Sequence, residues 1–361
     1  MLLDHYVTLG HCGLRVSPFA LGAMTFGSDL GWGSSVQDSE AILRRYFEAG
    51  GNFVDTANVY TRGHSEKIIG DFFKREPQLR QRCVLATKFY GNLFPGDPNG
   101  GGAGRKAIVQ QVEESLRRLQ TDFIDLYWMH VWDLYTPIGE TLRTLDDLVR
   151  QGKVRYLGFS DTPAWKLAQA QTLSMIRGYT PLVALQIEYS LLERTVEAEL
   201  IPAARELGLG VTPWGPLKGG ALSGKYTREN HGKIEPKRGA FLLPALQEKT
   251  YALVDVLERV AKELDSSPAR VALAWVQNRP GVTSSIIGAR TLEQLEDNLK
   301  ALEVKLGPEH QKLLDDASKP PFYVLGRFMA PPYSFAYGGT TVNGMAHPQL
   351  QMSPKNDAER Y

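Results

Sequence analysis

The sequence predicts a (β/α)8 barrel, a ring of parallel strands in which each strand is followed by a helix. Short runs that are apolar throughout alternate with amphipathic stretches along most of the chain. Runs without polar alternation are typical of strands buried on both faces, as in parallel sheets covered by helices. An open, doubly wound sheet is the main alternative. A dinucleotide-binding sheet of that kind is expected to show G-x-G-x-x-G after its first strand, and the chain has no such motif.

The elements follow in order after a β-hairpin expected at about 5–19, ahead of the repeat. The predicted strands are residues 19–22, 53–55, 82–87, 123–129, 153–160, 182–186, 209–214 and 284–287. The predicted helices are residues 35–49, 65–74, 108–119, 138–150, 163–177, 196–207, 248–264, 268–278 and 291–302. Pro77 is expected to end the helix over 65–74. Gly- and Pro-containing loops are expected at 91–104 and 215–245.

The organisation is therefore one barrel domain over residues 1–317, with the hairpin as its N-terminal addition. From about residue 318 the periodicity ends. Residues 318–361 are expected to be a C-terminal tail rather than a separate domain, and the pattern leaves open whether this tail lies over the barrel or is partly disordered.

Composition limits the possible partners and location. The 361 residues carry 41 basic and 40 acidic side chains, a balance that argues against a nucleic-acid partner. Neither a signal peptide nor an apolar run of about 18 residues is present, so we expect no membrane partner and a cytoplasmic location. Cys12 and Cys83 are too few for a disulfide framework and lack metal-ligand spacing, so no metal site is predicted.

Ionisable side chains stand at the ends of three consecutive predicted strands. Asp55, Lys88 and His130 each follow an apolar run, and Tyr60 follows Asp55 closely. The runs are separated by the length of one helix and its loops, so neighbouring parallel strands would deliver these groups to one end of the barrel. Each residue alone is more often structural than functional. Their combination indicates a site.

The combination suits carbonyl reduction, which needs a hydride donor at carbon and an acid at oxygen. Tyr60 is the predicted acid. Its reference pKa is about 10, and a Lys88 cation would favour the phenolate that remains after proton transfer. Asp55 would hold Lys88 charged and oriented, and His130 would donate a hydrogen bond to the substrate oxygen.

The chain resembles the aldo-keto reductase superfamily from about residue 6 to 305. The matching motifs are residues 21–27, 52–60, 86–88, 125–130, 158–160, 186–190 and 286–291. The resemblance implies a barrel with a tetrad of Asp55, Tyr60, Lys88 and His130, in which Tyr60 is the general acid and base. It also implies that the chain binds NADPH, with NADH possible, in extended form at the barrel mouth without a dinucleotide-fold motif.

The resemblance implies specific cofactor contacts. Ser160 and Gln186 would hold the nicotinamide carboxamide, and Trp214 would stack on the nicotinamide ring. The phosphate on the adenosine ribose would meet Arg290 and the free N–H groups near it. The remaining implied cofactor residues are Gly22, Met24, Thr25, Asp55, Asp161, Pro216, Leu217, Gly219, Lys225, Ile287, Gly288, Ala289, Gln294 and Asn298.

Two features of these segments depart from known patterns. The family usually has Ser-Asn after strand five, whereas this chain has Ser160-Asp161, and a carboxylate accepts from the carboxamide NH2 but cannot donate to its oxygen. The segment from Gly219 to Lys225 nearly matches a P-loop, but Tyr226 stands where the Mg²⁺-binding hydroxyl belongs. We therefore expect no nucleotide hydrolysis and interpret the segment as a cover over the cofactor pyrophosphate.

Aromatic residues are frequent in the loops after the predicted strands. They predict a pocket for aromatic or otherwise bulky apolar aldehydes and ketones, or for the corresponding alcohols. The candidate substrate contacts are Trp32, Tyr60, Phe89, Phe94, His130 and Trp132, with Tyr90 and Tyr135 nearby.

Two other function classes remain open at this point. One is a barrel aldolase that uses Lys88 as a Schiff-base nucleophile. The other is a redox-sensing or regulatory protein that binds the cofactor and turns over little. The sequence does not distinguish a monomer from a homo-oligomer.

Overall fold

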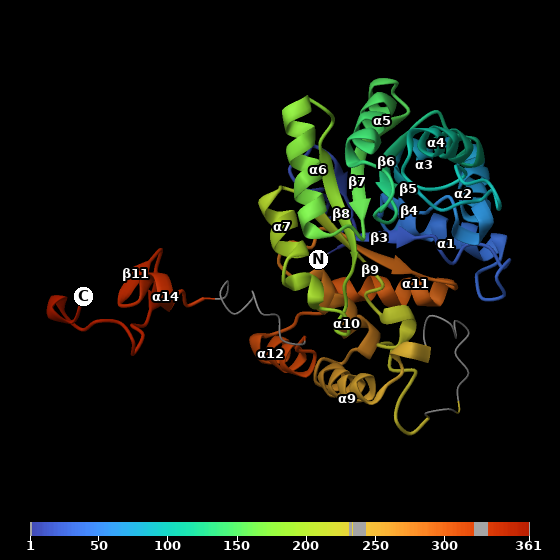
Figure 1. Ribbon diagram of the computed structural model, residues 1–361. Coiled ribbons are helices and arrows are strands. Elements are labelled where there is room, and N and C mark those ends of the chain that lie inside the picture. Colours follow the sequence, from blue (N-terminus) through green and yellow to red (C-terminus); the bar gives the residue numbers. More distant parts are fainter. Residues whose placement is uncertain (1, 231–232, 234–242, 321–330, 361) are drawn as a thin grey trace. The chain divides into compact units, whose positions relative to one another are not determined.

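A computed structural model describes residues 2–230, 233, 243–320 and 331–360 (Figure 1). By its internal contacts the chain divides into two compact units, Met1–Lys319 and Pro320–Tyr361. Parts of the predicted 215–245 segment and of the 318–361 tail lie outside the described residues. The prediction that the tail is not a separate domain stays a prediction.

The first unit is the predicted barrel. Its eight strands are all parallel, in the order β10-β3-β4-β5-β6-β7-β8-β9 (Figure 1). The ring closes between β9 and the segment before β10, where Val211 pairs with Val282 and the Thr283 N–H donates to the Val211 carbonyl at 2.8 Å. The strands are β3 (Phe19–Gly22), β4 (Phe53–Asp55), β5 (Val84–Phe89), β6 (Ile124–Met129), β7 (Val154–Ser160), β8 (Leu182–Glu188), β9 (Gly210–Trp214) and β10 (Ser285–Gly288).

Helices surround this ring (Figure 1). Those in the described part of the first unit are α1 (Val36–Glu48), α2 (His64–Arg75), α3 (Pro77–Arg82), α4 (Arg105–Leu119), α5 (Ile138–Arg150), α6 (Ala164–Arg177), α7 (Leu200–Glu206), α9 (Glu248–Glu263), α10 (Pro268–Gln277), α11 (Leu292–Leu299) and α12 (Pro308–Ala317). Short 3-10 turns are η1 (Tyr60–Gly63), η2 (Thr195–Glu197), η3 (Lys218–Gly220), η4 (Leu243–Ala245) and η5 (Lys300–Glu303).

Two helices that the sequence pattern does not predict, α3 and α12, both begin with proline. Pro77 and Pro308 occupy the first turn of their helices, where the missing N–H has no intrahelical partner in any case. Pro77 ends α2 as predicted, and it also begins the next helix.

The hairpin of β1 (Val7–Thr8) and β2 (Arg15–Val16) packs against residues at one end of the barrel interior. Leu9 and Val16 are fully buried in the same apolar cluster as residues at the N-terminal ends of the strands, such as Phe53 and Val84. The turn contacts the chain before β9, where the His11 N–H donates to the Gly208 carbonyl at 2.8 Å. The hairpin therefore closes the N-terminal end of the barrel.

Side chains along each strand point alternately into the barrel interior and outward toward the helices. On β6, Leu126 and Trp128 belong to the interior cluster, while Tyr127 and Met129 belong to the cluster shared with the helices. Side chains two residues apart share a face. The interior series therefore ends at the C-terminal mouth of the barrel in a ring of polar residues: Asp55, Lys88, His130, Ser160 and Gln186.

The second unit contains a small β-hairpin that was not predicted. α14 (Ser334–Tyr337) precedes β11 (Thr340–Val342) and β12 (Met345–His347), which pair antiparallel across Asn343 and Gly344. Both turn residues have positive φ, 49° and 80°, as a type I′ turn requires, and Asn-Gly is a strong hairpin signal. None of the helices in the described part of the chain has the length and apolar character that a membrane span needs.

Candidate active site

Lys88 is the centre of the site at the C-terminal mouth. Its side chain is fully buried. The ammonium donates to the Asp55 carboxylate, to the Thr56 carbonyl at 2.9 Å and to the Tyr60 hydroxyl at 3.2 Å. The structure thus brings together three of the four predicted catalytic residues around one cation.

The chain after β4 returns the Tyr60 phenol to Lys88. The Asn58 N–H donates to the Lys88 carbonyl at 3.1 Å, which ties the turn to β5. Thr61 and Arg62 then adopt left-handed conformations, with φ of 45° and 59°. A β-branched residue rarely adopts this conformation, and such strain persists only where the surroundings enforce it. Thr61 is held by donation to the Phe26 carbonyl at 2.8 Å.

Burial and charge fix the protonation of this group. Burial lowers the pKa of Lys88, but Asp55 and Tyr60 outweigh burial and the net shift is upward, so Lys88 remains an ammonium ion. Burial raises the pKa of Tyr60, and the nearby Lys88 opposes that shift without cancelling it. The expected effect of Lys88 on the phenol is therefore present but smaller than that of burial. Tyr60 is a protonated phenol with its proton available to a neighbour.

His130 completes the group as a neutral imidazole. Its ring lies edge-on to the Tyr60 ring, with 5.8 Å between centroids and 79° between planes. Burial, and then the charge of Lys88, lower the pKa of His130 to about 3. A neutral imidazole at this place can donate one N–H to an oxygen bound next to the phenol.

Gln186 and Asp161 connect the site to β7, β8 and β9. The Gln186 amide donates to Asp55 at 3.1 Å, and its amide oxygen accepts no hydrogen bond within the described residues. Asp161 accepts from the Trp214 indole N–H at 3.1 and 3.2 Å and from the Ser160 hydroxyl at 3.3 Å. The predicted carboxamide-binding and stacking residues therefore meet at the mouth. The contact between Asp161 and Trp214 was not predicted.

The predicted adenosine-side residues lie around the start of α11. Thr25 donates to the Ala289 carbonyl at 2.8 Å, and Asn298 donates to the Gly288 carbonyl at 3.1 Å. Gln294 accepts from the Arg290 N–H at 2.9 Å, so this N–H is already bonded within the chain. Arg290 also donates through its guanidinium to the Trp32 carbonyl at 3.4 Å. These contacts hold the loop between β10 and α11 in place.

Position Gly288 is open. A side chain there would meet no atom within 4 Å, so a ligand can approach the backbone. Gly22 and Ile287 pack in the barrel wall, where a Cβ on Gly22 would lie 2.6 Å from Ile286, and Met24 is half-buried above them. Among the predicted cofactor residues here, Gly288 and Gln294 are exposed and Arg290 is half-buried, so these three can present groups to a ligand.

The predicted cover segment follows β9. Pro216 is buried and Leu217 half-buried, and Gly219 is exposed in a left-handed turn with φ of 65°. Lys218 pairs with Glu188 at 2.5 Å, whereas Lys225 is exposed and its ammonium lies 5.4 Å from the centre of the Tyr226 ring. No helix follows Lys225 directly, as a P-loop would require.

Phe89, a predicted substrate contact, lies in the helix-facing layer of the barrel rather than in its interior. β5 continues one residue beyond Lys88, and alternation turns Phe89 outward, where it is fully buried beside Tyr127 with 5.0 Å between ring centres. The other aromatic candidates lie in loops: Trp32 and Trp132 are half-buried and Phe94 is 37% exposed.

The 91–104 loop is anchored beside these aromatics. The Asp133 carboxylate accepts from the Ala103 N–H at 2.8 Å and from the Thr136 hydroxyl at 2.7 Å, which links the loops after β5 and β6. Within the described residues, no cluster of His, Cys, Asp or Glu is arranged to hold a metal ion.

Comparison with known proteins places these observations in a family context. A sequence model described as "Aldo/keto reductase family" matches residues 18–319. The uncharacterized oxidoreductase YrpG of Bacillus subtilis is 42% identical over 320 residues, which cover 86% of this chain and 95% of that protein. An aryl-alcohol dehydrogenase [NADP(+)] of Phanerodontia chrysosporium is 36% identical, with 84% and 83% covered. The norsolorinic acid reductase of Aspergillus flavus is 33% identical, with 87% and 80% covered.

Proposed function

The chain belongs to the aldo/keto reductase family of oxidoreductases, and from this premise we propose that it interconverts aromatic aldehydes or ketones and their alcohols. The observation that carries the proposal is the buried contact of Lys88 with Asp55 and Tyr60 at the mouth of the barrel. A protonated phenol beside a buried ammonium ion is suited to give a proton to a developing alkoxide.

The mechanism assigns each residue one task. A nicotinamide cofactor held at the mouth by Ser160, Gln186 and Trp214 would supply the hydride for the carbonyl carbon. The carbonyl oxygen takes the Tyr60 proton, and the resulting phenolate is stabilised by Lys88, which Asp55 holds in place. Neutral His130 donates to the same oxygen and orients it. Alcohol oxidation follows these steps in reverse.

The residues at the mouth fit a nicotinamide cofactor. The amide oxygen of Gln186 is available to accept from the carboxamide NH2, and the Ser160 hydroxyl stands beside it. Trp214 offers an indole face for stacking. On the adenosine side, the Arg290 guanidinium forms no ion pair within the described residues, which favours NADPH over NADH because NADPH carries the additional phosphate.

The aromatic substrate class rests on the loops and on the relatives. Trp32, Phe94 and Trp132 bring aromatic surface to the loops after the strands. The relative from Phanerodontia chrysosporium is named for aryl alcohols, and we extend aryl substrates to this chain on that basis. Flat apolar surface of this kind binds aromatic rings by stacking and burial.

The experiment follows absorbance at 340 nm, the band of reduced nicotinamide, with a panel of aromatic and aliphatic carbonyls and either NADPH or NADH. The proposal expects NADPH-dependent turnover and higher kcat/KM for aromatic aldehydes than for small aliphatic ones. Higher kcat/KM for the aliphatic aldehydes would contradict the substrate class. Tight cofactor binding without turnover of any carbonyl would favour the regulatory alternative.

The aldolase alternative has less structural support. The Lys88 ammonium is fully buried and already donates to Asp55, Thr56 and Tyr60, so it is neither neutral nor free to attack a carbonyl. Borohydride trapping of a carbonyl substrate on Lys88 would reverse this conclusion.

A further inference from the structure

The charges of the ionisable groups at the barrel mouth do not sum to zero. The Lys88 ammonium is offset by the Asp55 carboxylate, with which it pairs. His130 is neutral because burial lowers its pKa to about 3. Asp161 then adds a second carboxylate, which forms no ion pair with any residue that the structure describes. The nearby Glu188 is already paired with Lys218. Burial raises the pKa of Asp161, and the hydrogen bonds from Trp214 and Ser160 oppose that shift without cancelling it. With Asp161 ionised, the site carries one unpaired negative charge.

Local structure fixes the position of this charge. Asp161 has a φ of 43°, a left-handed conformation that aspartate and asparagine tolerate better than most residues. Its N–H donates to the Gln186 carbonyl at 3.0 Å, and both carboxylate oxygens accept from the Trp214 indole. The carboxylate is therefore held between the residue assigned to the carboxamide and the residue assigned to stacking.

Hydride transfer changes the charge of the group expected at this place. The reduced nicotinamide ring is neutral, and the oxidised ring carries one positive charge. We propose that the Asp161 carboxylate, fixed by Trp214 and Ser160, makes this site bind the oxidised cofactor more tightly than the reduced one. The inference rests on the proposed function, because it requires the nicotinamide to occupy this mouth.

The consequence concerns the direction of the reaction on the protein. Preferential binding of the oxidised form favours hydride transfer from the bound cofactor to the carbonyl. It also makes release of the oxidised cofactor slow, so that NADP+ is a strong product inhibitor of carbonyl reduction. An asparagine at position 161, as is usual in the family, supplies no such charge.

Two substitutions separate the charge from the hydrogen bond. Asp161→Asn keeps the left-handed backbone and an oxygen that accepts from Trp214, but it removes the charge. Asp161→Gly keeps the backbone conformation and removes both. Asp71→Asn is the control for a lost carboxylate far from the mouth, since Asp71 lies on α2 and pairs with Lys67.

The test is isothermal titration calorimetry of the full chain and the variants with NADP+ and with NADPH, at pH 8, where a carboxyl group is ionised. The measured quantity is the ratio of the Kd for NADPH to the Kd for NADP+. We expect Asp161→Asn and Asp161→Gly to lower this ratio by about fivefold or more, as loss of one unit charge at short range implies, and Asp71→Asn to leave it unchanged. Asp161→Gly should also change the tryptophan fluorescence of the free protein, which Asp161→Asn should preserve.

The outcomes are distinguishable. An unchanged ratio in Asp161→Asn, with both cofactors still bound, would overturn the inference and leave the proposed function standing. Failure of the wild type to bind either cofactor would overturn the proposed function and the inference with it.

Discussion

At the scale of single residues, the site depends on burial acting differently on each group. Lys88 keeps its proton because Asp55 and Tyr60 outweigh the cost of burying a cation. Tyr60 keeps its proton because burial outweighs the influence of Lys88. His130 has no carboxylate partner among the described residues, so burial and Lys88 together leave it neutral. One environment thus gives a cation, an acid and a neutral donor.

The low pKa of His130 predicts that the free energy of unfolding falls in acid. Its pKa is about 3 in the folded protein and about 6.5 in the unfolded chain, so at pH 7 it is neutral in both states. As the pH falls below 6.5, the unfolded chain takes up a proton that the folded protein rejects, and stability is lost until the pH reaches 3. By pH 5 the loss from this residue is about 2 kcal/mol.

Urea unfolding of the wild type and His130→Gln at pH 7 and pH 5 measures this effect. Glutamine keeps a side-chain N–H but does not titrate. The free energy of unfolding of the wild type is expected to fall about 2 kcal/mol further between the two pH values than that of the variant. Equal losses would show that His130 titrates normally in the folded protein.

At the scale of elements, the barrel is held by contacts at both of its ends and along its side. Gly10 lies in the hairpin turn with a φ of 64°, and a Cβ there would stand 2.5 to 2.7 Å from backbone atoms of Gly208, Gly210 and Val183. Gly13 lies in the same turn, where a Cβ would meet no atom within 4 Å. Only the first glycine is required by the packing of the hairpin against the barrel.

Gly10→Ala is therefore expected to lower the free energy of unfolding by about 2 to 4 kcal/mol, through both the clash and the left-handed conformation. Gly13→Ala is the matched control, and we expect it to change stability by less than about 1 kcal/mol. Urea unfolding of the two variants measures the difference. Equal effects would mean that the hairpin shifts freely over the end of the barrel.

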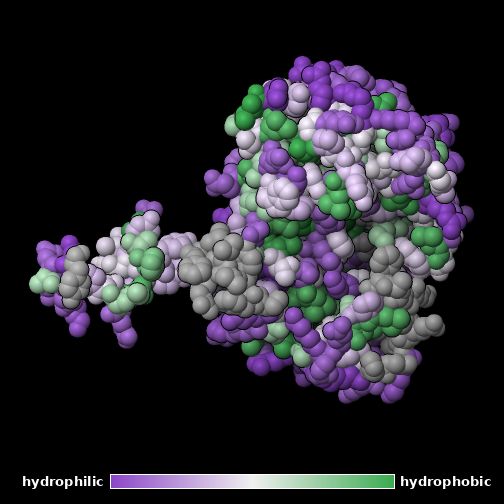
Figure 2. Space-filling view, viewed as in Figure 1, coloured by the Kyte–Doolittle hydropathy of each residue, from purple (hydrophilic) through white to green (hydrophobic). Residues whose placement is uncertain are grey.

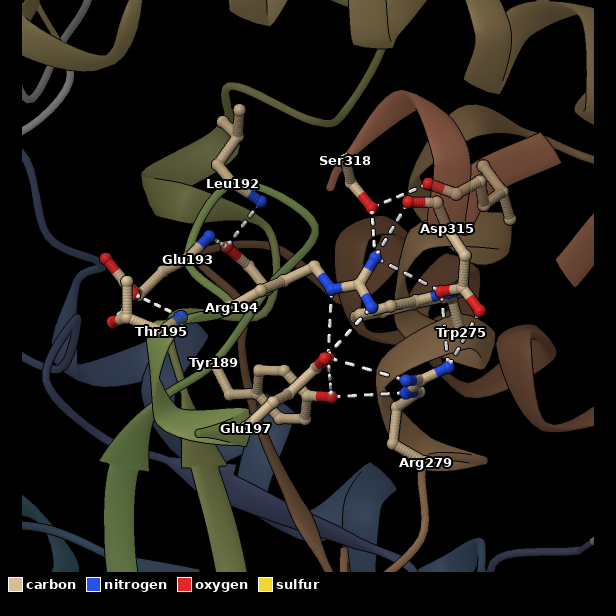
Figure 3. Close-up of polar contacts among 12 residues, drawn as sticks. Tyr189, Leu192, Glu193, Arg194, Thr195, Glu197, Trp275, Arg279, Asp315 and Ser318 are labelled. Carbon is tan, nitrogen blue, oxygen red and sulfur yellow. Dashed lines mark hydrogen bonds and ion pairs between the residues drawn. The ribbon is translucent and has the colours of Figure 1, made fainter. Parts of the chain in front are cut away.

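Ion pairs and hydrogen bonds between charged side chains hold α12 against the barrel. Figure 3 shows Arg194 and Arg279 directed toward Glu197 and Asp315, with the Trp275 indole beside them. Arg194 is 8% exposed and donates to Glu197 at 2.9 Å through two nitrogens. It also donates to the Asp315 carbonyl at 3.0 Å and, at the end of α12, to the Ser318 hydroxyl at 2.8 Å.

Arg194→Met is expected to lower the free energy of unfolding by about 2 kcal/mol, because carboxylates and the end of α12 lose their shared donor. Faster hydrogen exchange in α12 should accompany the loss. Arg143→Met is the control: Arg143 is 53% exposed and pairs with Asp147 on one helix, so its cost should stay below about 0.5 kcal/mol. Similar costs for the two variants would mean that the cluster does not hold α12.

At the scale of the whole molecule, the order of strands and helices could be predicted from the hydrophobic pattern. A strand buried on both faces is apolar at every position, whereas an amphipathic helix has apolar residues on one face only. The mouth could be predicted because parallel strands all end on one side. Asp55, Lys88 and His130 lie there as expected. The surface of the molecule around the barrel mixes polar and apolar side chains (Figure 2) and offers no comparable signal.

The parts that could not be predicted depend on contacts between distant residues and on the exact ends of strands, rather than on a sequence pattern. Asp161 and Trp214 meet across β8, from strands that do not pair, and nothing in their spacing indicates this contact. The outward position of Phe89 depends on β5 running one residue beyond Lys88, which turns the next side chain to the other face of the strand. In the second unit, by contrast, the hairpin has a local sequence signal, the Asn343-Gly344 turn.

The most direct test of the central claim is the turnover of an aromatic aldehyde by the Tyr60→Phe variant, with NADPH binding measured in the same preparation. The variant keeps the ring beside His130 and loses the hydroxyl that Lys88 contacts. We expect the Kd for NADPH to stay within about twofold of the wild type and kcat to fall by at least about a hundredfold. A variant that keeps more than about a tenth of the wild-type kcat would show that Tyr60 is not the acid, and the account of this site would fail.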